Sequence, residues 1–537
     1  MHKPIWRAFE LTLTTSKQYA NPFLDVDVTA TFRGPDGRTV TRLAFWDGEG
    51  VWRVRAALTA VGPWSCEFSS SDPENHDFTG GCEVECVPYE GDMAIYRHGF
   101  LRVGPQGRYL IHHDGTPFFW LGDTHWTFVT EEKWDESNCP RYESQFRACV
   151  DRRVRQKFTV YQSNFRDARD FNMFGRYDEY LIEGEAGLIP DVEFLRRNVD
   201  PKMKYIADAG LVNAVGYSWG PAIVSEGGVA RYRLLAKYLV ARYGAYPVVW
   251  TLAGELPGYF PGTRREIADS WREVALETAK WDSYGNIISA HQAAGLPFTD
   301  IYQGESWYGL AMTQAAHGDF EIWGGNYSAY REKFPRCPVV ESEGLYEGAD
   351  SNEAMSRVIT DKMLRNLAYS AIQNGCCGYT YGANGVWELQ WEAGVGGIGW
   401  GDMAWWDGLE LPGADQLTYM REMYESVGWH RLRPIQHLVD QSIFLPALKK
   451  RDEAYFTADD EMTCVVGYFP PTAMKACTIH GLASHSYTAR WFDPETGAYS
   501  LITECARPVG GAWSLPRPES RVFREKRDAV LILTANP

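Results

Sequence analysis

The sequence lacks any long run of basic residues, although it extends over 537 residues. Lysines and arginines number 53 against 70 aspartates and glutamates, so the formal net charge is −17. A protein that binds nucleic acid through its phosphates needs a clustered basic surface. We therefore do not expect nucleic acid as a partner. The acidity itself indicates a solvated surface rather than a particular substrate.

Long apolar runs are also missing. No stretch approaches the roughly 18 apolar residues of a membrane span, and the opening MHKPIWRAFELTLTTSK lacks the continuous apolar core of a secretion signal. These absences argue against a membrane partner. They lead us to expect a cytoplasmic protein, with a leader that was already removed staying open as an alternative.

The spacing of cysteines and histidines does not match the common metal and redox motifs. The 11 cysteines are an odd number without a CxxC pair, and we interpret Cys82, Cys86, Cys376 and Cys377 as packing residues. No HExxH motif or closely spaced histidine triad occurs. The glycine-rich GVGGIGWGD at 394 does not join a strand to a helix as a phosphate loop does. We expect neither a metal nor a cofactor.

What is present at the two ends of the sequence is a pattern of short strands. In residues 1–90, runs such as LDVDVTATF and GVWRVRAAL are split by the turn sequences GPDG and WDGEG, which is typical of an immunoglobulin- or fibronectin-like β-sandwich. Residues 436–537 return to short strands, namely FTADD, TCVVGYF, SYTARWFD and AVLILTA. They predict a second small β-sandwich.

The central region, residues 91–435, alternates apolar strand-like runs with amphipathic stretches. VARYRLLAKYLVARYGA at 229 and TRREIADSWREVALETAKW at 263 have the length of a crossover helix between parallel strands. The eight strand-like runs are FFWLGD at 118, FTVYQSNF at 158, LVNAVGYSW at 211, VVWTLAGE at 248, NIISAH at 286, WYGLAMTQ at 307, PVVESE at 338 and CGYTYG at 377. They predict a (β/α)8 TIM barrel, so the expected fold class is multidomain α/β plus β, with the barrel between two β-sandwiches.

Two carboxylates follow strands on opposite sides of this predicted barrel. VVWTLAGE places Glu255 after the fourth strand, and PVVESEGLYEG places Glu343 after the seventh. Active sites of such barrels lie beyond the C-terminal strand ends, where paired carboxylates can cleave a glycosidic bond. One protonates the leaving oxygen while the other attacks the anomeric carbon or activates water. Glu341 and Glu347 stay open as alternatives to Glu343, which is nearer the strand end than Glu341.

Other strand ends carry polar and aromatic side chains. A sugar needs many hydrogen-bond partners and a flat apolar surface, and the sequence contains 21 tryptophans and 30 tyrosines. The predicted substrate-binding residues are Asp123, His125, Trp126, Gln162, Asn164, Tyr217, Trp219, His291, Gln314, His317, Tyr346, Tyr381 and Asn384.

Several sequence blocks resemble the apiosidase-like family of barrel glycoside hydrolases over nearly the whole chain. They are TPFFWLGDTHW, VVWTLAGE, IISAH, MTQAAHG, PVVESEGLYEG, GYTYGANGVW and LELPGADQL, in that order. The resemblance implies that Glu255 is the general acid/base and Glu343 the nucleophile. It also implies an N-terminal β-sandwich and a C-terminal β domain of the type labelled collagen-binding. The chain departs from the family in having AGE where GGD is usual, QAAH for QSGH and EGLYE for EPxYE, so apiose specificity does not follow from the resemblance.

These observations together predict a retaining, exo-acting glycoside hydrolase that works by double displacement. The expected substrate is a carbohydrate, namely a short glycan or a glycoside of plant type, with a pentosyl or furanosyl unit as one option. Two alternatives stay open: a non-catalytic carbohydrate-binding or adhesion protein, and an inverting glycosidase of the same architecture. No segment predicts a homo-oligomer, and that state stays open too.

Overall fold

The computed structural model describes residues 1–129, 132–165, 189–221, 223, 228–258, 262–293, 300–314, 337–350, 358–392, 401–441, 453–471, 473, 476–483, 486–515 and 527–537. Within these ranges no helix combines the length and the apolar character needed to cross a membrane.

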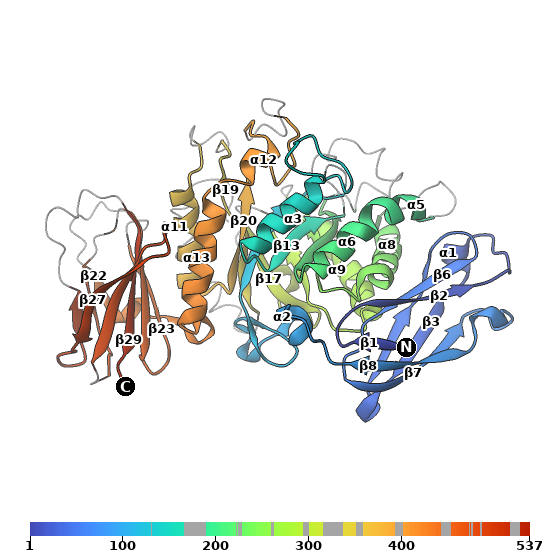
Figure 1. Cartoon of the computed structure of the whole chain (residues 1–537), viewed down its shortest axis with the longest axis horizontal. Helices are drawn as coiled ribbons and strands as arrows, with labels where there is room; N and C mark the ends of the chain where they lie inside the picture. Colours follow the sequence, from blue (N-terminus) through green and yellow to red (C-terminus); the bar gives the residue numbers. More distant parts are fainter. Residues whose placement is uncertain are drawn as a thin grey trace.

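Eight parallel strands form a closed barrel in the centre of the molecule (Figure 1). In sheet order they are β12 (Trp120–His125), β13 (Val160–Asn164), β14 (Val212–Trp219), β15 (Val248–Gly254), β16 (Ile288–His291), β17 (Tyr308–Gln314), β18 (Val339–Glu343) and β20 (Gly378–Ala383). The first and last strands pair from Trp120↔Gly378 to Asp123↔Tyr381, which closes the sheet. Each of the eight predicted runs overlaps one of these strands, so the barrel prediction is confirmed.

Helices cover the outside of the barrel. The longer ones are α3 (Gln145–Arg155), α6 (Asp200–Asp208), α8 (Gly228–Tyr243), α9 (Arg264–Trp281), α11 (Asp361–Gln373) and α13 (Gly413–Ser426). Short elements complete the described connections: α2 (Ala94–Arg97), β9 (Arg102–Val103), η3 (Pro105–Gly107), β10 (Leu110–Ile111), β11 (Pro117–Phe118), α5 (Val192–Phe194), η5 (Leu195–Val199), η6 (Asp300–Tyr302), β19 (Tyr346–Glu347), α12 (Trp405–Gly408) and η8 (Trp429–Arg431). The two predicted amphipathic helices, at 229 and 263, correspond to α8 and α9 and are confirmed.

Side chains of the strands alternate between the barrel interior and the helix layer. Gln162 of β13 donates a hydrogen bond from Nε2 to the carbonyl oxygen of Ser342 in β18, 2.7 Å away. Because β12 and β20 separate these two strands in the sheet, the bond must cross the interior, and Gln162 points inward. Its neighbour Tyr161 packs against Phe146 of α3 and therefore faces outward.

The N-terminal region forms two sheets packed face to face. The larger sheet is mixed, because β1 and β8 pair in parallel, and the smaller one is antiparallel. One has the strand order β1 (His2–Pro4), β8 (Gly81–Val87), β7 (Gly62–Ser70), β3 (Val28–Arg33), β4 (Thr39–Leu43), and the other β2 (Phe9–Thr14), β6 (Val51–Ala56), β5 (Phe45–Trp46). Helix α1 (Pro22–Asp25) connects β2 to β3 and so joins the two sheets, whereas the turns η1 (Pro35–Gly37) and η2 (His76–Phe78) join β3 to β4 and β7 to β8 within the larger one. The buried residues between the sheets include Phe32, Val54 and Trp64.

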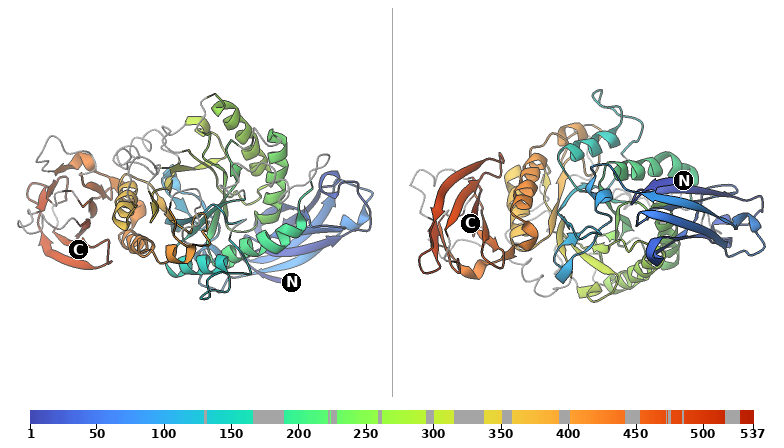
Figure 2. Two further views of the ribbon diagram at one scale, coloured as in Figure 1. Left: turned by 90° about the horizontal axis from the view of Figure 1, so that it is seen from above. Right: turned by 60° about the horizontal axis from the view of Figure 1, so that its bottom comes forward.

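The C-terminal region also consists of two sheets around a buried apolar cluster. The larger has the order β21 (Arg433–Pro434), β23 (Tyr455–Ala458), β24 (Cys464–Phe469), β29 (Ala529–Ala535), β26 (Tyr487–Phe492), β27 (Tyr499–Ala506), and the smaller β22 (Val439–Gln441), β25 (Cys477–Ile479), β28 (Trp513–Leu515). The turn η9 (Gln436–Leu438) precedes β22. The views in Figures 1 and 2 agree that the two β domains lie on opposite sides of the barrel.

Buried side chains hold each β domain to a barrel helix. Arg42 of β4 donates from Nη2 to the carbonyl oxygens of Val240 and Ala241, at 2.8 and 3.0 Å, in the last turn of α8. The last carbonyls of a helix have no partner within the helix and lie at its negative end, so a buried guanidinium is favourable there. On the other side of the barrel, Arg365 of α11 forms two hydrogen bonds of 2.9 Å with Asp528 in the C-terminal region.

We expect the substitution Arg42→Met to destabilise the protein by about 2–4 kcal/mol, because it removes the buried guanidinium that donates to the Ala241 and Val240 carbonyl oxygens and leaves Val240 with Gly244 N–H as its donor. The change is measured as the free energy of unfolding in urea, followed by tryptophan fluorescence. Arg38→Met is the matched control, since Arg38 is exposed on the same domain. Equal stability of the two variants would contradict this account of the interface.

Candidate active site

Glu255 lies in a short loop directly after β15, at the C-terminal end of the barrel. The loop is held on both sides: Gly220 N donates to Gly254 O at 2.7 Å, and Leu256 N donates to His291 O at 2.8 Å. Glu255 itself has a φ of +55°, in the left-handed region that non-glycine residues rarely adopt. Such strained positions occur often at functional sites because surrounding contacts must enforce them. The side chain is half-buried.

Glu343 is the last residue of β18 and is 4% exposed. Its Oε1 accepts a hydrogen bond of 2.5 Å from the hydroxyl of Tyr346. Its Oε2 lies 3.1 Å from Nε2 of His291, although the alignment is too poor for a well-directed hydrogen bond. Burial raises the pKa of Tyr346 well above its ordinary value, and the charges of Glu343 and, more weakly, Glu255 add to this increase. Both carboxylates therefore act on the same phenol.

His291, the last residue of β16, connects the two carboxylate positions. Its Nδ1 accepts the backbone N–H of Glu255 at 3.4 Å, while its Nε2 faces Glu343. An Nδ1 that accepts a hydrogen bond carries no proton, so the neutral ring has its N–H at Nε2, the nitrogen that lies near the Glu343 carboxylate. One imidazole thus fixes the places of Glu255 and Glu343 at the same mouth of the barrel.

Aromatic rings surround this pair of carboxylates. Trp126 donates from Nε1 to the Tyr346 hydroxyl at 2.9 Å, and its ring centroid lies 5.5 Å from Trp219 and 5.3 Å from His291. Trp387 packs against Tyr346 with a centroid separation of 5.3 Å. Trp387 was not among the predicted site residues, although it ends the block GYTYGANGVW. Flat apolar rings of this kind are the groups on which sugar rings stack in proteins.

Two glycines make room for the rings. A Cβ on Gly254 would come within 2.1 Å of the Trp219 ring, and a Cβ on Gly382 within 2.1 Å of the Tyr346 ring. The glycine in the AGE sequence therefore allows Trp219 to lie against the backbone immediately before Glu255.

Buried amides at the strand ends add polar groups. Both polar atoms of Asn164, at the end of β13, and the Oε1 of Gln314, at the end of β17, are buried and form no hydrogen bond with any described residue. Asn384 donates to Gly348 O at 2.9 Å, while its Oδ1 is likewise buried and has no partner in the described part of the chain. A buried amide without a partner is costly unless a ligand satisfies it.

Four of the predicted substrate-binding residues face the helix layer instead. Tyr217 shares a hydrogen bond of 2.9 Å with Thr278 of α9, and Tyr381 donates to Glu347 at 2.7 Å. Asp123 and His125 lie on the outer face of β12, completely buried beside α3. These four side chains lie on the outer face of the barrel strands, between the strands and the helices. Their positions therefore do not favour the predicted contact with substrate. His317 lies outside the described residues.

Asp123 and His125 belong to a buried charge network. His125 Nε2 lies 2.8 Å from Asp123, and its Nδ1 lies 2.8 Å from Glu132. Arg153 of α3 donates to Asp123 at 2.6 Å. Burial alone would lower the pKa of His125, but the carboxylates of Glu132 and Asp123 raise it to about 9. The network neutralises charge between the first strand and its helix, which is a structural role.

The two alternatives to Glu343 occupy different surroundings. Glu341 is fully buried and accepts a hydrogen bond of 2.9 Å from Thr313. Glu347 accepts from the Tyr381 hydroxyl at 2.7 Å and from the Gly413 N–H, at the start of α13, at 2.9 Å. Glu343, in contrast, lies 3.1 Å from Nε2 of His291 and accepts the hydrogen bond of the Tyr346 hydroxyl. The geometry favours Glu343 over both alternatives as the partner of Glu255.

The described residues contain no group of three or more His, Cys, Asp or Glu side chains arranged to hold a metal ion. The chemistry that their arrangement does offer is that of carboxylates, with the imidazole of His291 and the phenol of Tyr346 as hydrogen-bond donors.

Comparison with known proteins agrees with this architecture. The structure of a protein titled glycoside hydrolase is similar with a TM-score of 0.64 at 20% identity, covering 82% of this chain and 97% of that one. A candidate glycoside hydrolase from Bacteroides vulgatus has a TM-score of 0.73 at 15% identity over 100% of both chains. A glycoside hydrolase family 5 protein from Bacteroides vulgatus has a TM-score of 0.64 at 20% identity, covering 82% and 94%. No protein with a curated description matches the chain significantly.

The fold found in these comparisons is that of barrel glycoside hydrolases with added β domains. Residues 104–431 match the family described as apiosidase-like, catalytic domain. Residues 2–71 match a domain of unknown function, DUF5060. The chain therefore belongs to the apiosidase-like family and is a glycoside hydrolase.

Burial raises the pKa of Glu347 from 4.5 to about 7, although the hydrogen bond from Tyr381 opposes the increase. The folded-state pKa exceeds the unfolded one, so the contribution to stability is complete below pH 4.5 and is lost as the pH rises to about 7. We expect Glu347 to account for a loss of about 3 kcal/mol in this window. The variant Glu347→Gln, which resembles the protonated acid, should lose less stability in urea unfolding measured across the window. A wild-type-like loss in the variant would contradict the assignment.

Proposed function

We propose that the protein is a retaining, exo-acting glycosidase, with Glu343 as nucleophile and Glu255 as general acid/base. The observation that carries the proposal is that His291 contacts both residues at one mouth of the barrel: its Nδ1 accepts the backbone N–H of Glu255, and its Nε2 lies 3.1 Å from the Glu343 carboxylate. Retaining glycosidases use two carboxylates on opposite sides of the scissile bond.

In the first step, a carboxylate oxygen of Glu343 attacks the anomeric carbon. The bond from that carbon to the leaving oxygen breaks, and Glu255 gives its proton to the leaving oxygen. The hydroxyl of Tyr346 and the N–H of His291 face the Glu343 carboxylate. The Tyr346 hydroxyl stabilises the charged form of the nucleophile by its hydrogen bond, and the polar N–H of His291 does so by its proximity, before the attack.

In the second step, Glu255 is a carboxylate and removes a proton from water. The water oxygen bonds to the anomeric carbon, and the bond between sugar and Glu343 breaks, which restores both side chains. The half-buried position of Glu255 is consistent with exchange of a leaving group for water on its side, whereas Glu343 is buried.

The proposed substrate is a short glycan or a glycoside that ends in a pentosyl or furanosyl unit. The family description supports such a unit, and the aromatic rings and buried amides supply surfaces for a sugar ring. The chain has Glu255 where the sequence resemblance implies an aspartate. The longer side chain supports a leaving group of a different shape from that of apiosides.

We also propose that the protein works in the cytoplasm. All 11 cysteines are free thiols, including Cys66 and Cys82, which lie directly opposite each other in the N-terminal sheet. Free thiols in such a pair are consistent with a reducing compartment.

Replacing the nucleophile tests the proposal directly. A screen of aryl glycosides and plant-type oligosaccharides should find a substrate that the wild type hydrolyses, and Glu343→Gln should lower kcat by about three orders of magnitude or more while retaining sugar binding. Glu347→Gln is the matched control, because Glu347 is bound to Tyr381 and Gly413 away from His291. Full turnover by Glu343→Gln would exclude Glu343 as nucleophile.

The acid role of Glu255 predicts a dependence on the leaving group. Glu255→Gln should lose much more activity on an alkyl glycoside than on a dinitrophenyl glycoside, because only the alkoxide needs a proton to leave. The same assay on the wild type, followed by NMR, should show a first product with the anomeric configuration of the substrate. Inversion of that configuration would replace double displacement by the single-displacement alternative.

A further inference from the structure

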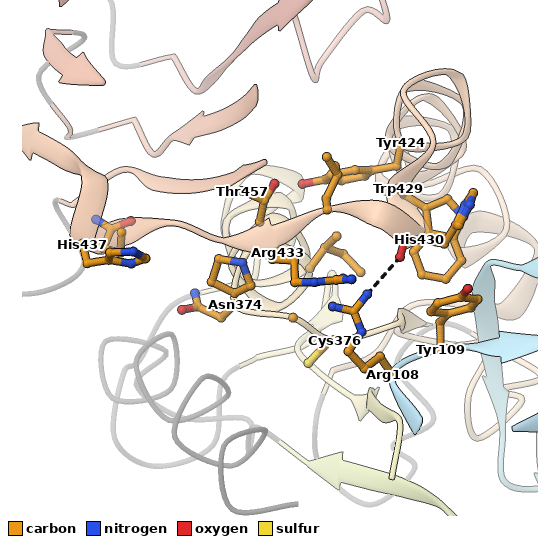
Figure 3. A pocket seen from close by; sticks show the side chains of 15 residues that line it. Arg108, Tyr109, Asn374, Cys376, Tyr424, Trp429, His430, Arg433, His437 and Thr457 are labelled. Atoms are coloured by element: carbon orange, nitrogen blue, oxygen red, sulfur yellow. Dashed lines mark hydrogen bonds between the residues drawn. The ribbon is translucent and has the colours of Figure 1, made fainter. Parts of the chain in front are cut away.

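A separate cavity of about 490 Å³ lies at the other end of the barrel (Figure 3). Its walls include Asn374 and Cys376, which precede β20, and Thr457 of the C-terminal sheet. Glu343 ends its strand whereas these barrel residues precede theirs, and all eight strands are parallel. The cavity is therefore at the floor of the barrel, on the opposite side from the candidate active site. Its volume is within the range of small-ligand sites, which is about 300–1,000 Å³.

The cavity has a basic character that differs from the rest of the chain. Arg108, Arg433, His430 and His437 line it, and no aspartate or glutamate is among the described lining residues. The whole sequence has a formal net charge of −17, so a basic cavity here attracts anions that the overall charge repels.

The two arginines are positioned by contacts at the edge of the cavity. Arg108 donates to the carbonyl oxygen of His430 at 3.3 Å, the bond drawn in Figure 3. Arg433 is ion-paired with Asp460, with its Nε 3.1 Å from Oδ1 and its Nη2 3.3 Å from Oδ2, so Asp460 offsets part of its charge. Burial and the charge of Arg431 lower the pKa of His430, so this histidine is a neutral hydrogen-bonding group at neutral pH. The positive charge in the cavity therefore comes from the arginines.

Aromatic rings form the other wall. Tyr109 and Trp429 pack edge to face with centroids 5.7 Å apart. Tyr424 is fully buried, and its hydroxyl has no hydrogen-bond partner among the described residues. In Figure 3 this hydroxyl points in the direction of Thr457, whose own hydroxyl donates to Gln373 at 2.6 Å and keeps lone pairs to accept another bond. An unpaired hydroxyl of this kind is a ready donor for a ligand oxygen.

We propose that this cavity is a second ligand site, which binds one sugar ring bearing a carboxylate, that is, a uronic acid or a uronate end of an oligosaccharide. The planar carboxylate would bind to the guanidinium of Arg108 and to that of Arg433, which would exchange part of its pairing with Asp460 for the ligand. The ring has the aromatic wall to pack against, and its hydroxyls have Tyr424 and Thr457 as partners. The inference is independent of the chemistry proposed for Glu255 and Glu343.

Binding to the full-length protein tests the site, with D-glucuronate as probe and D-glucose as its neutral counterpart in isothermal titration. We expect saturable binding of glucuronate and none of glucose at the same concentrations. Arg433→Gln should weaken glucuronate binding by about tenfold or more. Arg490→Gln is the matched control, since Arg490 is exposed on β26 of the same domain and does not line the cavity, and it should leave binding unchanged.

Tyr424→Phe separates a ligand role from a structural one. It removes only the hydroxyl, so we expect about three- to tenfold weaker glucuronate binding. The Tm of the unbound protein should stay the same or rise, because a buried group without a partner is removed. The proposal is overturned if glucuronate does not bind saturably, if glucose binds equally well, or if binding is unchanged in both Arg433→Gln and Tyr424→Phe. Unchanged binding in both variants would be expected if glucuronate bound at the mouth of the barrel instead of in this cavity.

Discussion

The pairing of β12 with β20 is the constraint on which the rest of the structure depends. It joins the first barrel strand to the last, from Trp120↔Gly378 to Asp123↔Tyr381. The close approach needs a glycine, since a Cβ on Gly378 would come within 2.3 Å of the Trp120 carbonyl oxygen. Once the sheet is closed, strand ends that are far apart in the sequence must surround one opening. Glu255 and Glu343 can be connected by His291 only because of this closure.

The barrel helices serve a second purpose as attachment sites for the flanking domains. Arg42 reaches the carbonyl end of α8 from the N-terminal sandwich, and Arg365 of α11 binds Asp528 in the C-terminal one. Tyr369 of α11 also stacks on Tyr468, with ring centroids 4.7 Å apart. Buried guanidinium groups need several acceptors to offset the loss of water. Such contacts hold each domain in a defined orientation, and they create the cavity beside the C-terminal sheet.

Side chains that alternate along each strand fall into two groups, one at the mouth of the barrel and one between the strands and the helices. Inward or end positions such as Glu343 and His291 gather at the mouth, whereas outward positions such as Asp123 and His125 neutralise Arg153 and Glu132 behind the sheet. Both sets are buried and polar, and both occur in the same short sequence blocks.

The sequence by itself determined the eight strands, the order of strand and helix, and the two terminal sandwiches, because apolar runs and amphipathic stretches report local structure directly. It also indicated Glu255 and Glu343 as candidates, since a glutamate that follows an apolar strand-like run can be recognised in the sequence. Tertiary structure alone decided which polar residues face the opening. A parallel strand buried on both faces shows no polar alternation, so Tyr217 and Tyr381 could not be distinguished from inward residues. The role of Trp387 and the floor cavity likewise depend on contacts between distant segments, which no local pattern records.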